Sequence, residues 1–268
     1  MTPTTPPPYP EGHQLLAGKN VLITAAAGAG IGFAAAKRCV EEGARVFISD
    51  IHPERTAQAA QALAELSGHE VGHFLCDVTQ EDDVQGLVSA AREDLGSVDV
   101  LINNAGLGGT CDLVDMIDDD WFRVIDVTLN SVFRMTRAIL PHMISARQGA
   151  IVNNASVLGW RAQKGQSHYA AAKAGVMALT RCAALEVAEH GVRINAVSPS
   201  FATHPFLVKT TPADQLAALE AGEAYGRGAE PWEVANVMIF LASDYSSYMT
   251  GEVVAVSSQH QFVAGDFN

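Results

Sequence analysis

The sequence NVLITAAAGAGIGFAAAK, residues 20–37, joins a short apolar run to an alanine-rich stretch through a turn that contains several glycines. The apolar run is typical of a buried strand, and the alanine-rich stretch is typical of a helix. Gly28, Gly30 and Gly32 allow a tight bend and a close approach of the backbone to a ligand. The pattern therefore predicts a strand–turn–helix unit whose helix N-terminus presents free N–H groups to a phosphate.

The same alternation of strand and helix continues along the chain. We expect strands at Asn20–Thr24, Arg45–Asp50, Val71–Asp77, Val98–Asn103, Ala150–Ala155, Arg193–Val197 and Val253–Ser257. We expect helices at Gly32–Glu42, Pro53–Leu66, Glu81–Leu95, Asp119–Ser145, Tyr169–His190 and Trp232–Ser243. This alternation predicts an α/β fold: a single doubly wound, Rossmann-type domain with a seven-stranded parallel sheet and helices on both faces.

The organisation of the chain around this domain follows from local composition. Residues 1–14 are rich in Pro and Thr and predict a flexible arm, whereas residues 15–258 form the predicted nucleotide-binding domain. Pro199–Gly228 interrupts the alternation, with one expected helix at Ala213–Glu223, and is predicted to be a substrate lid. Residues 259–268 form a C-terminal tail.

Composition excludes several classes of protein. The chain has 268 residues, 48% of them apolar, and a net charge of −13, which argues for a large core and against a nucleic-acid partner. No apolar run reaches the roughly 20 residues of a membrane span, and the first residues lack the features of a signal peptide. Four cysteines and nine histidines show no metal-ligand spacing. We therefore expect a cytoplasmic protein with a small-molecule substrate and no metal.

An acidic residue ends the second expected strand. The Asp50 carboxylate is placed to accept hydrogen bonds from the adenosine ribose and to repel a 2′-phosphate, so we expect NAD rather than NADP. Asp77 is placed to reach the adenine, or else to cap the following helix. A glycine turn without a ligand and a capping role for Asp50 remain alternatives. The predicted cofactor contacts in this half of the chain are Gly28, Gly30, Ile31, Gly32, Asp50, Asp77 and Val78.

Three residues, one after the fifth expected strand and two on the next helix, form a catalytic pattern. Tyr169 and Lys173 are four residues apart, so they share one helix face, and Ser156 follows a strand end that borders the ligand crevice. An ammonium beside a phenol favours the phenolate, so we expect Lys173 to lower the pKa of Tyr169. Ser156 would orient a substrate oxygen while Tyr169 transfers its proton. The alternative is an ordinary amphipathic helix face.

Together these motifs resemble the short-chain dehydrogenase/reductase family from about Gly18 to Ser257. The matching pieces are the glycine turn, Asp77-Val78, the NNAG tetrapeptide Asn103–Gly106, Ser156, the YAAAK segment Tyr169–Lys173 and the RINAVSP segment Arg193–Pro199. The resemblance implies a strand order of 3-2-1-4-5-6-7 and a homotetramer or homodimer. It also implies that Tyr169 and Lys173 touch the nicotinamide cofactor, along with Asn104, Ala105, Gly106, Pro199 and Thr203.

The sequence departs from the family pattern at three places. The glycine turn is one residue longer than usual, and Ser200 replaces the glycine that commonly follows Pro199. The helix after NNAG carries Thr128 where the family has a catalytic Asn, and an Asn occurs at Asn130. Two helical positions are about 200° apart, so Asn130 cannot simply substitute for that residue. We keep Thr128 and Asn130 as alternative members of the catalytic set.

Apolar residues near these motifs predict the substrate wall. The expected pocket residues are Leu107, Val157, Trp160, Phe201 and Phe206. They would favour a bulky apolar substrate, although several of them could instead pack the lid onto the core. Arg161 and Lys164 stand nearby and would attract a carboxylate or a coenzyme A phosphate, unless they are ordinary solvated charges.

Two further segments refine the resemblance. NNASVLGWRAQ (residues 153–163) and SDYSSYMTGEVVAVSSQH (residues 243–260) are similar to actinobacterial family members of steroid ring catabolism. This implies an NAD(H)-dependent oxidoreductase that interconverts a secondary alcohol and a ketone on a hydroxy-indane coenzyme A thioester. The alternatives are a 3-oxoacyl-thioester reductase and a non-catalytic nucleotide-binding protein.

Overall fold

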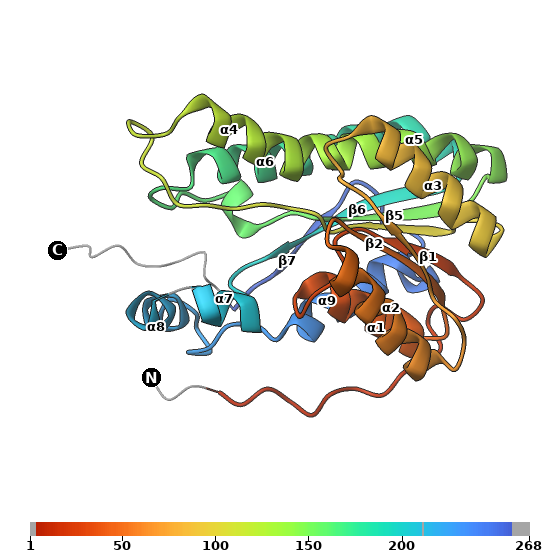
Figure 1. Ribbon diagram of the computed structural model, residues 1–268, viewed down its shortest axis with the longest axis horizontal. Coiled ribbons are helices and arrows are strands. Elements are labelled where there is room, and N and C mark those ends of the chain that lie inside the picture. The colour runs from red at the N-terminus through yellow and green to blue at the C-terminus, as the bar shows by residue number, and fades with distance from the viewer. Residues whose placement is uncertain (1–3, 211, 259–268) are drawn as a thin grey trace.

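Parallel strands form the central layer of the fold in the order β3-β2-β1-β4-β5-β6-β7. The computed structural model describes residues 4–210 and 212–258 (Figure 1). The strands are β1 Asn20–Ile23, β2 Arg45–Asp50, β3 Gly72–Leu75, β4 Val100–Asn103, β5 Gly149–Asn154, β6 Val192–Pro199 and β7 Val253–Val256. The predicted fold class and strand order are confirmed. The order reverses between β1 and β4, where such sheets open a ligand crevice at the carboxyl ends of their strands.

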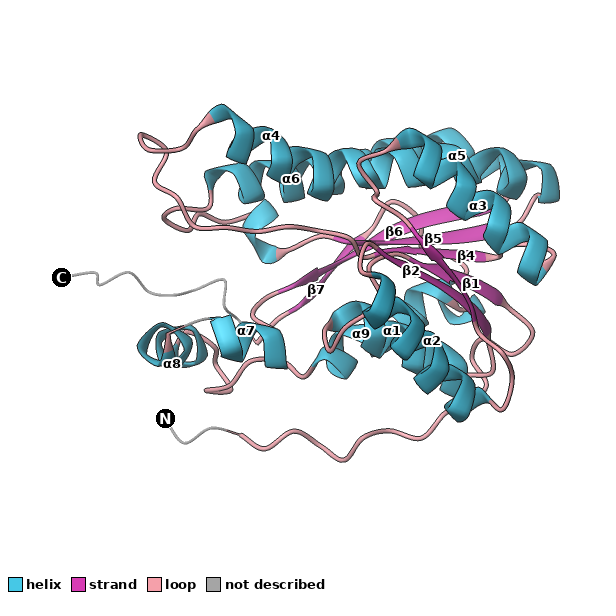
Figure 2. Cartoon of the chain, in the orientation of Figure 1, coloured by secondary structure: helices cyan, strands magenta, loops and turns pink. Residues whose placement is uncertain are grey.

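Helices cover both faces of this sheet (Figure 2). They are α1 Ile31–Glu41, α2 Pro53–Ser67, α3 Glu81–Leu95, α4 Asp118–Ile125, α5 Ser131–Ala146, α6 Ser167–Val187, α7 Pro205–Thr210, α8 Ala213–Ala221 and α9 Pro231–Ala242. Helices α1, α2 and α9 pack with one face of the sheet, and α3, α5 and α6 pack with the other. None of the helices in the described ranges has both the length and the apolar character needed to cross a membrane.

The side-chain alternation of the strands explains these two cores. Ile23 and Ile48 pack against the α1, α2 and α9 layer, whereas Leu22 and Leu101 pack against the opposite layer. All four side chains are completely buried. Successive strand residues point to opposite faces, so a strand that is covered on both sides consists of consecutive apolar residues. The continuous apolar runs in the sequence are explained by the helices that cover both faces of the sheet.

The long helix expected over Asp119–Ser145 is divided in the structure. Helices α4 and α5 are joined by a π-helical turn at Asp126–Asn130. Apolar periodicity continues on both sides of the turn, so the sequence pattern predicts a single helix. Such widened turns often occur at functional sites, and this one contains the fully buried Thr128.

The segment Pro199–Gly228 leaves the carboxyl end of β6, contains α7 and α8, and returns to the body of the protein. Its two ends are tied where Thr203 N–H donates to the Ala229 carbonyl and Ala229 N–H donates to the Phe201 carbonyl, each at 2.9 Å. Helix α8 ends at Ala221, close to the predicted end. Helix α7 falls where a loop was expected.

The described part of the N-terminal arm runs beside α1 and α9 (Figure 1). The Tyr9 hydroxyl donates to Glu41 at 2.6 Å, and its ring lies edge-on to Trp232 with 5.4 Å between centroids. The Thr4 N–H donates to the carbonyl of Tyr225 at 2.9 Å. The arm thus joins α1 to the chain that follows α8. Residues 1–3 and the predicted tail at 259–268 lie outside the described residues.

Candidate active site

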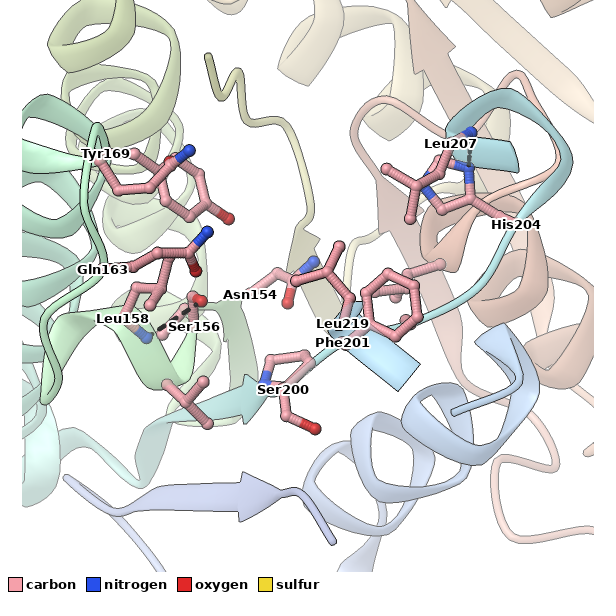
Figure 3. Close-up of a pocket in the computed structure, with 16 residues that line it drawn as sticks. Asn154, Ser156, Leu158, Gln163, Tyr169, Ser200, Phe201, His204, Leu207 and Leu219 are labelled. Atoms are coloured by element: carbon pink, nitrogen blue, oxygen red, sulfur yellow. Dashed lines mark hydrogen bonds between the residues drawn. The ribbon is translucent and has the colours of Figure 1, made fainter. Parts of the chain in front are cut away.

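A cavity of about 310 Å³ lies at the carboxyl ends of β5 and β6 (Figure 3). The end of β5 and the start of α6 supply the polar side chains Asn154, Ser156 and Tyr169. The segment after β6 supplies much of the opposite wall, including Phe201, His204, Leu207 and Leu219. The cavity therefore places a cluster of hydroxyl and amide groups opposite an apolar wall.

The three predicted catalytic residues come together beside this cavity. Ser156 and Tyr169 both line it, and the Ser156 side chain is near enough to act on the pKa of the phenol. Ser156 is held by its own turn, because its Oγ accepts a hydrogen bond from Leu158 N–H at 3.2 Å. Lys173 lies one helical turn after Tyr169, with its Nζ 5.5 Å from the centroid of the phenol ring. The spacing argument thus predicted a real juxtaposition.

The electrostatics of this cluster are governed by burial. Only 3% of Lys173 is exposed, and this burial lowers the pKa of its ammonium to about 7. Burial also raises the pKa of Tyr169, against the opposing effect of the Ser156 side chain. The expected lowering of the Tyr169 pKa by Lys173 is therefore wrong for this structure. Because burial penalises the charged ammonium, Lys173 releases its proton more readily than an exposed lysine does.

Thr128 and Asn130 have different surroundings. The Thr128 hydroxyl is bonded to the backbone of Leu107, the residue that follows the NNAG tetrapeptide. The Asn130 amide donates to the carboxylate of Asp126 at 2.9 Å, and the same carboxylate accepts from Arg134. Thr128 therefore contacts a loop that borders the predicted site, whereas Asn130 bonds to a residue of its own helical turn.

The glycine turn fits the phosphates of a nicotinamide dinucleotide. A Cβ atom added to Gly28 or Gly30 would meet no atom within 4 Å, so the backbone there is open to a ligand. At Gly32 the added atom would lie 2.3 Å from both the Ala25 carbonyl oxygen and the Asn104 amide. Gly28 and Gly30 thus leave space at the N-terminus of α1, whereas Gly32 permits close packing. Ile31, between them, lines the cavity.

Asp50 lies at the end of β2, next to this turn. Its carboxylate accepts hydrogen bonds from Ala27 N–H and His52 N–H, each at 3.2 Å. Only 10% of the side chain is exposed, and Arg55 approaches it to 4.0 Å. Burial raises the pKa of Asp50, while the bond from Ala27 and the charge of Arg55 act in the opposite direction. The residue thus places an acceptor beside the glycine turn, as an adenosine ribose requires.

The predicted cofactor contacts that follow β3 and β4 also make contacts within the protein itself. Asp77 accepts hydrogen bonds from the N–H and hydroxyl of Thr79, at 2.9 and 2.7 Å, which is the capping alternative. The neighbouring Val78 is buried. The N–H groups of Asn104 and Ala105 both donate to the Thr24 hydroxyl. Thr24, the residue after β1, therefore holds the NNAG segment in place. A Cβ atom added to Gly106 would come within 3.4 Å of Lys173 Nζ.

The resemblance to the family predicts that Pro199 and Thr203 touch the nicotinamide cofactor. Pro199 lines the cavity, and the Thr203 hydroxyl is buried without a hydrogen-bond partner among the described residues. An orphaned buried hydroxyl fits a site that a polar ligand completes. His204 also lines the cavity; its Nδ1 accepts from Leu207 N–H, and burial lowers its pKa.

The predicted substrate wall is found in part. Val157 and Phe201 line the cavity, Leu107 is half-buried against Thr128, and Trp160 is 48% exposed. The side chain of Phe206 lies outside the described residues.

The two basic residues near this wall differ. Lys164 pairs with Asp112 at 3.2 Å and is 87% exposed, as a solvated charge would be. The terminal nitrogens of Arg161 are buried, and residues 4–210 and 212–258 offer them no hydrogen-bond partner. Within the described residues, no group of three or more His, Cys, Asp or Glu side chains is arranged to hold a metal ion.

Sequence reasoning missed Asn154, which lines the cavity. Four further lining residues fall within segments expected to form the substrate wall, Val157–Gln166 and Pro199–Gly228, but were not predicted individually: Leu158, Gln163, Gln166 and Leu219. Asn154 could have been found, because a polar residue that ends a buried parallel strand faces the ligand crevice.

Comparison with known proteins agrees with this geometry. Residues 25–258 match a family model described as enoyl-(acyl carrier protein) reductase. The chain belongs to the short-chain dehydrogenase/reductase family and is an oxidoreductase. Among its relatives is the (5R,7aS)-5-hydroxy-7a-methyl-1-oxo-2,3,5,6,7,7a-hexahydro-1H-indene-carboxyl-CoA reductase of Mycobacterium tuberculosis. It is 61% identical over 250 residues, which cover 93% of this chain and 95% of that protein.

Two other relatives widen the comparison. A 3-oxoacyl-(acyl-carrier-protein) reductase of Thermotoga maritima is 41% identical and is covered over 97% of its length by 90% of this chain. The crystal structure of a short-chain dehydrogenase from Mycobacterium smegmatis superposes with a TM-score of 0.84 at 56% identity. That match covers 94% of this chain and 97% of the other.

Proposed function

We propose that this protein interconverts a secondary alcohol and a ketone on a hydroxy-indane coenzyme A thioester, with NAD(H) as its cofactor. The observation that carries the chemistry is the placement of Ser156 and Tyr169 in one cavity, where they face an apolar wall with Lys173 buried behind them. The substrate class is supported by the 61% identical relative, whose name describes a hydroxyindene-carboxyl-CoA reductase.

The position of each catalytic residue determines its proposed role. Ser156 Oγ and Tyr169 Oη line the same cavity, so both can hydrogen-bond the oxygen of the reacting alcohol or ketone. The bound nicotinamide supplies or accepts the hydride. Tyr169 Oη gives a proton to the substrate oxygen during reduction and takes it back during oxidation. Lys173, buried with a pKa of about 7, is able to hold or release a proton behind it at neutral pH.

The preference for NAD rests on Asp50. A buried carboxylate beside the glycine turn accepts hydrogen bonds from ribose hydroxyls but repels a 2′-phosphate. Replacing Asp50 by Ser should weaken NAD binding and bring the dissociation constants for NAD and NADP closer together. Arg55→Gln is the matched control, because it changes a residue beside Asp50 and leaves the Asp50 carboxylate in place. Tighter binding of NADP than NAD by the unmodified protein would contradict this part of the proposal.

The segment Pro199–Gly228 is the proposed substrate lid. Phe201, Leu207 and Leu219 belong to it and line the cavity, so its apolar side chains would cover a bulky ring system. A 3-oxoacyl-thioester reductase is the second candidate. The 41% identical reductase from Thermotoga maritima supports it, and an acyl chain would also fit an apolar wall.

A substrate panel distinguishes these candidates. The purified protein would be assayed with NAD(H) and NADP(H) on hydroxyindane coenzyme A thioesters, hydroxysteroids and 3-hydroxyacyl thioesters. We expect the highest kcat/KM with NAD(H) and the hydroxyindane thioester. A higher value with 3-hydroxyacyl thioesters would favour the second candidate. Saturable NAD binding without turnover of any member would indicate a non-catalytic nucleotide-binding protein.

We further propose that the protein works in the cytoplasm as a homotetramer or homodimer. Helices α4, α5 and α6 carry large apolar side chains that solvent reaches in one chain, with exposures of 63% for Phe122, 45% for Phe133 and 80% for Leu185. Such residues support an interface between copies. Light scattering of the purified protein should give two or four times the chain mass, and the mass of a single chain would contradict the proposal.

A further inference from the structure

Asn154, the last residue of β5, contacts two parts of the site at once. Its backbone carbonyl accepts a hydrogen bond from Lys173 Nζ at 2.5 Å. Its side-chain Nδ2 donates to Asn104 Oδ1 at 3.0 Å. The same side chain lines the cavity together with Ser156 and Tyr169 (Figure 3). A single residue therefore joins the buried lysine to the NNAG segment.

The contact continues to the glycine turn. The Nδ2 of Asn104 donates to the carbonyl of Ala25 at 3.0 Å, and Ala25 opens that turn with a positive φ of 51°. Gly32 packs against the same two groups so closely that even a Cβ there would collide with both. The chain of contacts from the turn to the lysine thus runs through Ala25, Asn104, Asn154 and Lys173.

The neighbouring asparagine shows that this placement is specific. Asn153 and Asn154 are consecutive in one strand, so their side chains point to opposite faces. The Asn153 side chain accepts from Asn103 and donates to Thr180, each at 2.9 Å, in a buried network. Asn154 instead faces the cavity, and its Oδ1 is buried with no hydrogen-bond partner in the part of the chain that the structure describes. Identical residue types therefore have separate tasks, and Asn153 provides a matched control.

We propose that Asn154 is a positioning residue that ties Lys173 to the turn predicted to hold the cofactor phosphates. Its amide fixes the end of β5 against Asn104, and this holds the carbonyl that receives the lysine Nζ in one place. The cofactor seat and the lysine then keep a constant geometry relative to each other. This inference rests on the proposed function for the role of Lys173, but the contact itself can be tested without substrate.

The first test is the titration of Lys173 in the cofactor-free protein. NMR of protein with ¹³C-labelled lysine reports each side chain, and the signal that disappears in Lys173→Met identifies Lys173. Asn154→Leu removes the amide contacts at similar volume and frees the carbonyl to move from Nζ. A hydrogen bond to the charged form favours that form, so the titration should shift to lower pH. Asn154→Ser, which keeps a short donor, should shift it less.

The second test measures the consequences for binding and turnover. In Asn154→Leu we expect kcat to fall about 10- to 100-fold with little change in substrate KM, because the lysine is misplaced rather than removed. The dissociation constant for NAD should rise, since Asn104 loses its partner. Asn153→Ser should lower the urea midpoint of unfolding but leave the Lys173 titration and the substrate KM unchanged.

Two outcomes would overturn the inference. A Lys173 titration in Asn154→Leu that matches the unmodified protein would show that Asn154 does not position the lysine. An equal shift in Asn153→Ser would show that any weakening of β5 has this effect. Absence of turnover on the whole substrate panel would defeat the proposed function instead, and the lysine titration would still decide the role of Asn154.

Discussion

The hydroxyl of Thr128 accepts a hydrogen bond from the N–H of Leu107 and donates one to the carbonyl of the same residue, each at 3.0 Å. Thr128 lies in the π-helical turn between α4 and α5 and is completely buried. Leu107 follows the NNAG tetrapeptide at the end of β4. A single threonine thus satisfies both backbone groups of the loop that leaves the sheet beside the proposed site.

Replacement of Thr128 by Val should show how much this contact contributes to the free energy of unfolding. Valine has nearly the same shape, so the N–H and carbonyl of the half-buried Leu107 would lose the hydroxyl that pairs with them. We expect the free energy of unfolding to fall by about 1–3 kcal/mol. Urea unfolding at neutral pH provides the measurement. Thr128→Ser keeps the hydroxyl and is the control; a Val variant that is more stable than the Ser variant would contradict the assignment.

Most of the fold, but less of the candidate site, could be predicted from the sequence. Apolar runs such as Asn20–Ile23 identify strands because both faces of the sheet are covered, and Tyr169 and Lys173 were paired correctly because helical spacing is a local property. The π-helical turn at Asp126–Asn130 could not be read, since apolar periodicity persists through it.

The pKa shifts of Tyr169 and Lys173 could not be predicted from residue spacing. The raised pKa of Tyr169 and the lowered pKa of Lys173 are caused mainly by desolvation, which is a property of the whole packed structure. The link through Asn154 joins residues from distant parts of the chain, so no spacing rule displays it.

Two glycines of the first turn should respond differently to substitution by alanine. Gly28→Ala adds a methyl group to open space, so stability should be nearly unchanged while NAD binding weakens because the backbone is covered. Gly32→Ala places the methyl group against Ala25 and Asn104 and should lower the melting temperature. Thermal unfolding with and without NAD measures both effects. A normal NAD affinity in Gly28→Ala would show that this glycine does not approach the cofactor.

Burial of Lys173 should make stability depend on pH. The ammonium has a pKa of about 7 in the folded protein and 10.5 as its ordinary value, so the folded state binds this proton less tightly than the unfolded state. The destabilisation is then fully present below about pH 7 and disappears as the pH rises toward 10.5. Each unit of pKa difference corresponds to about 1.4 kcal/mol.

Lys173→Met removes this cost and tests it. The variant should exceed the unmodified protein in unfolding free energy at about pH 6, and the excess should shrink at about pH 9.5. Denaturant titrations of both proteins at the two pH values provide the comparison. An excess that is the same at both pH values would mean that the lysine is not the source of the pH dependence.

The central claim is that Tyr169 transfers the proton to and from the substrate oxygen. The measurement that tests it most directly is turnover by Tyr169→Phe on the best substrate of the panel, together with its dissociation constant for NAD. We predict a loss of kcat of at least about 100-fold with NAD affinity nearly unchanged, because only the phenolic hydroxyl is removed. A Phe variant that keeps most of its kcat would contradict this account of the active site.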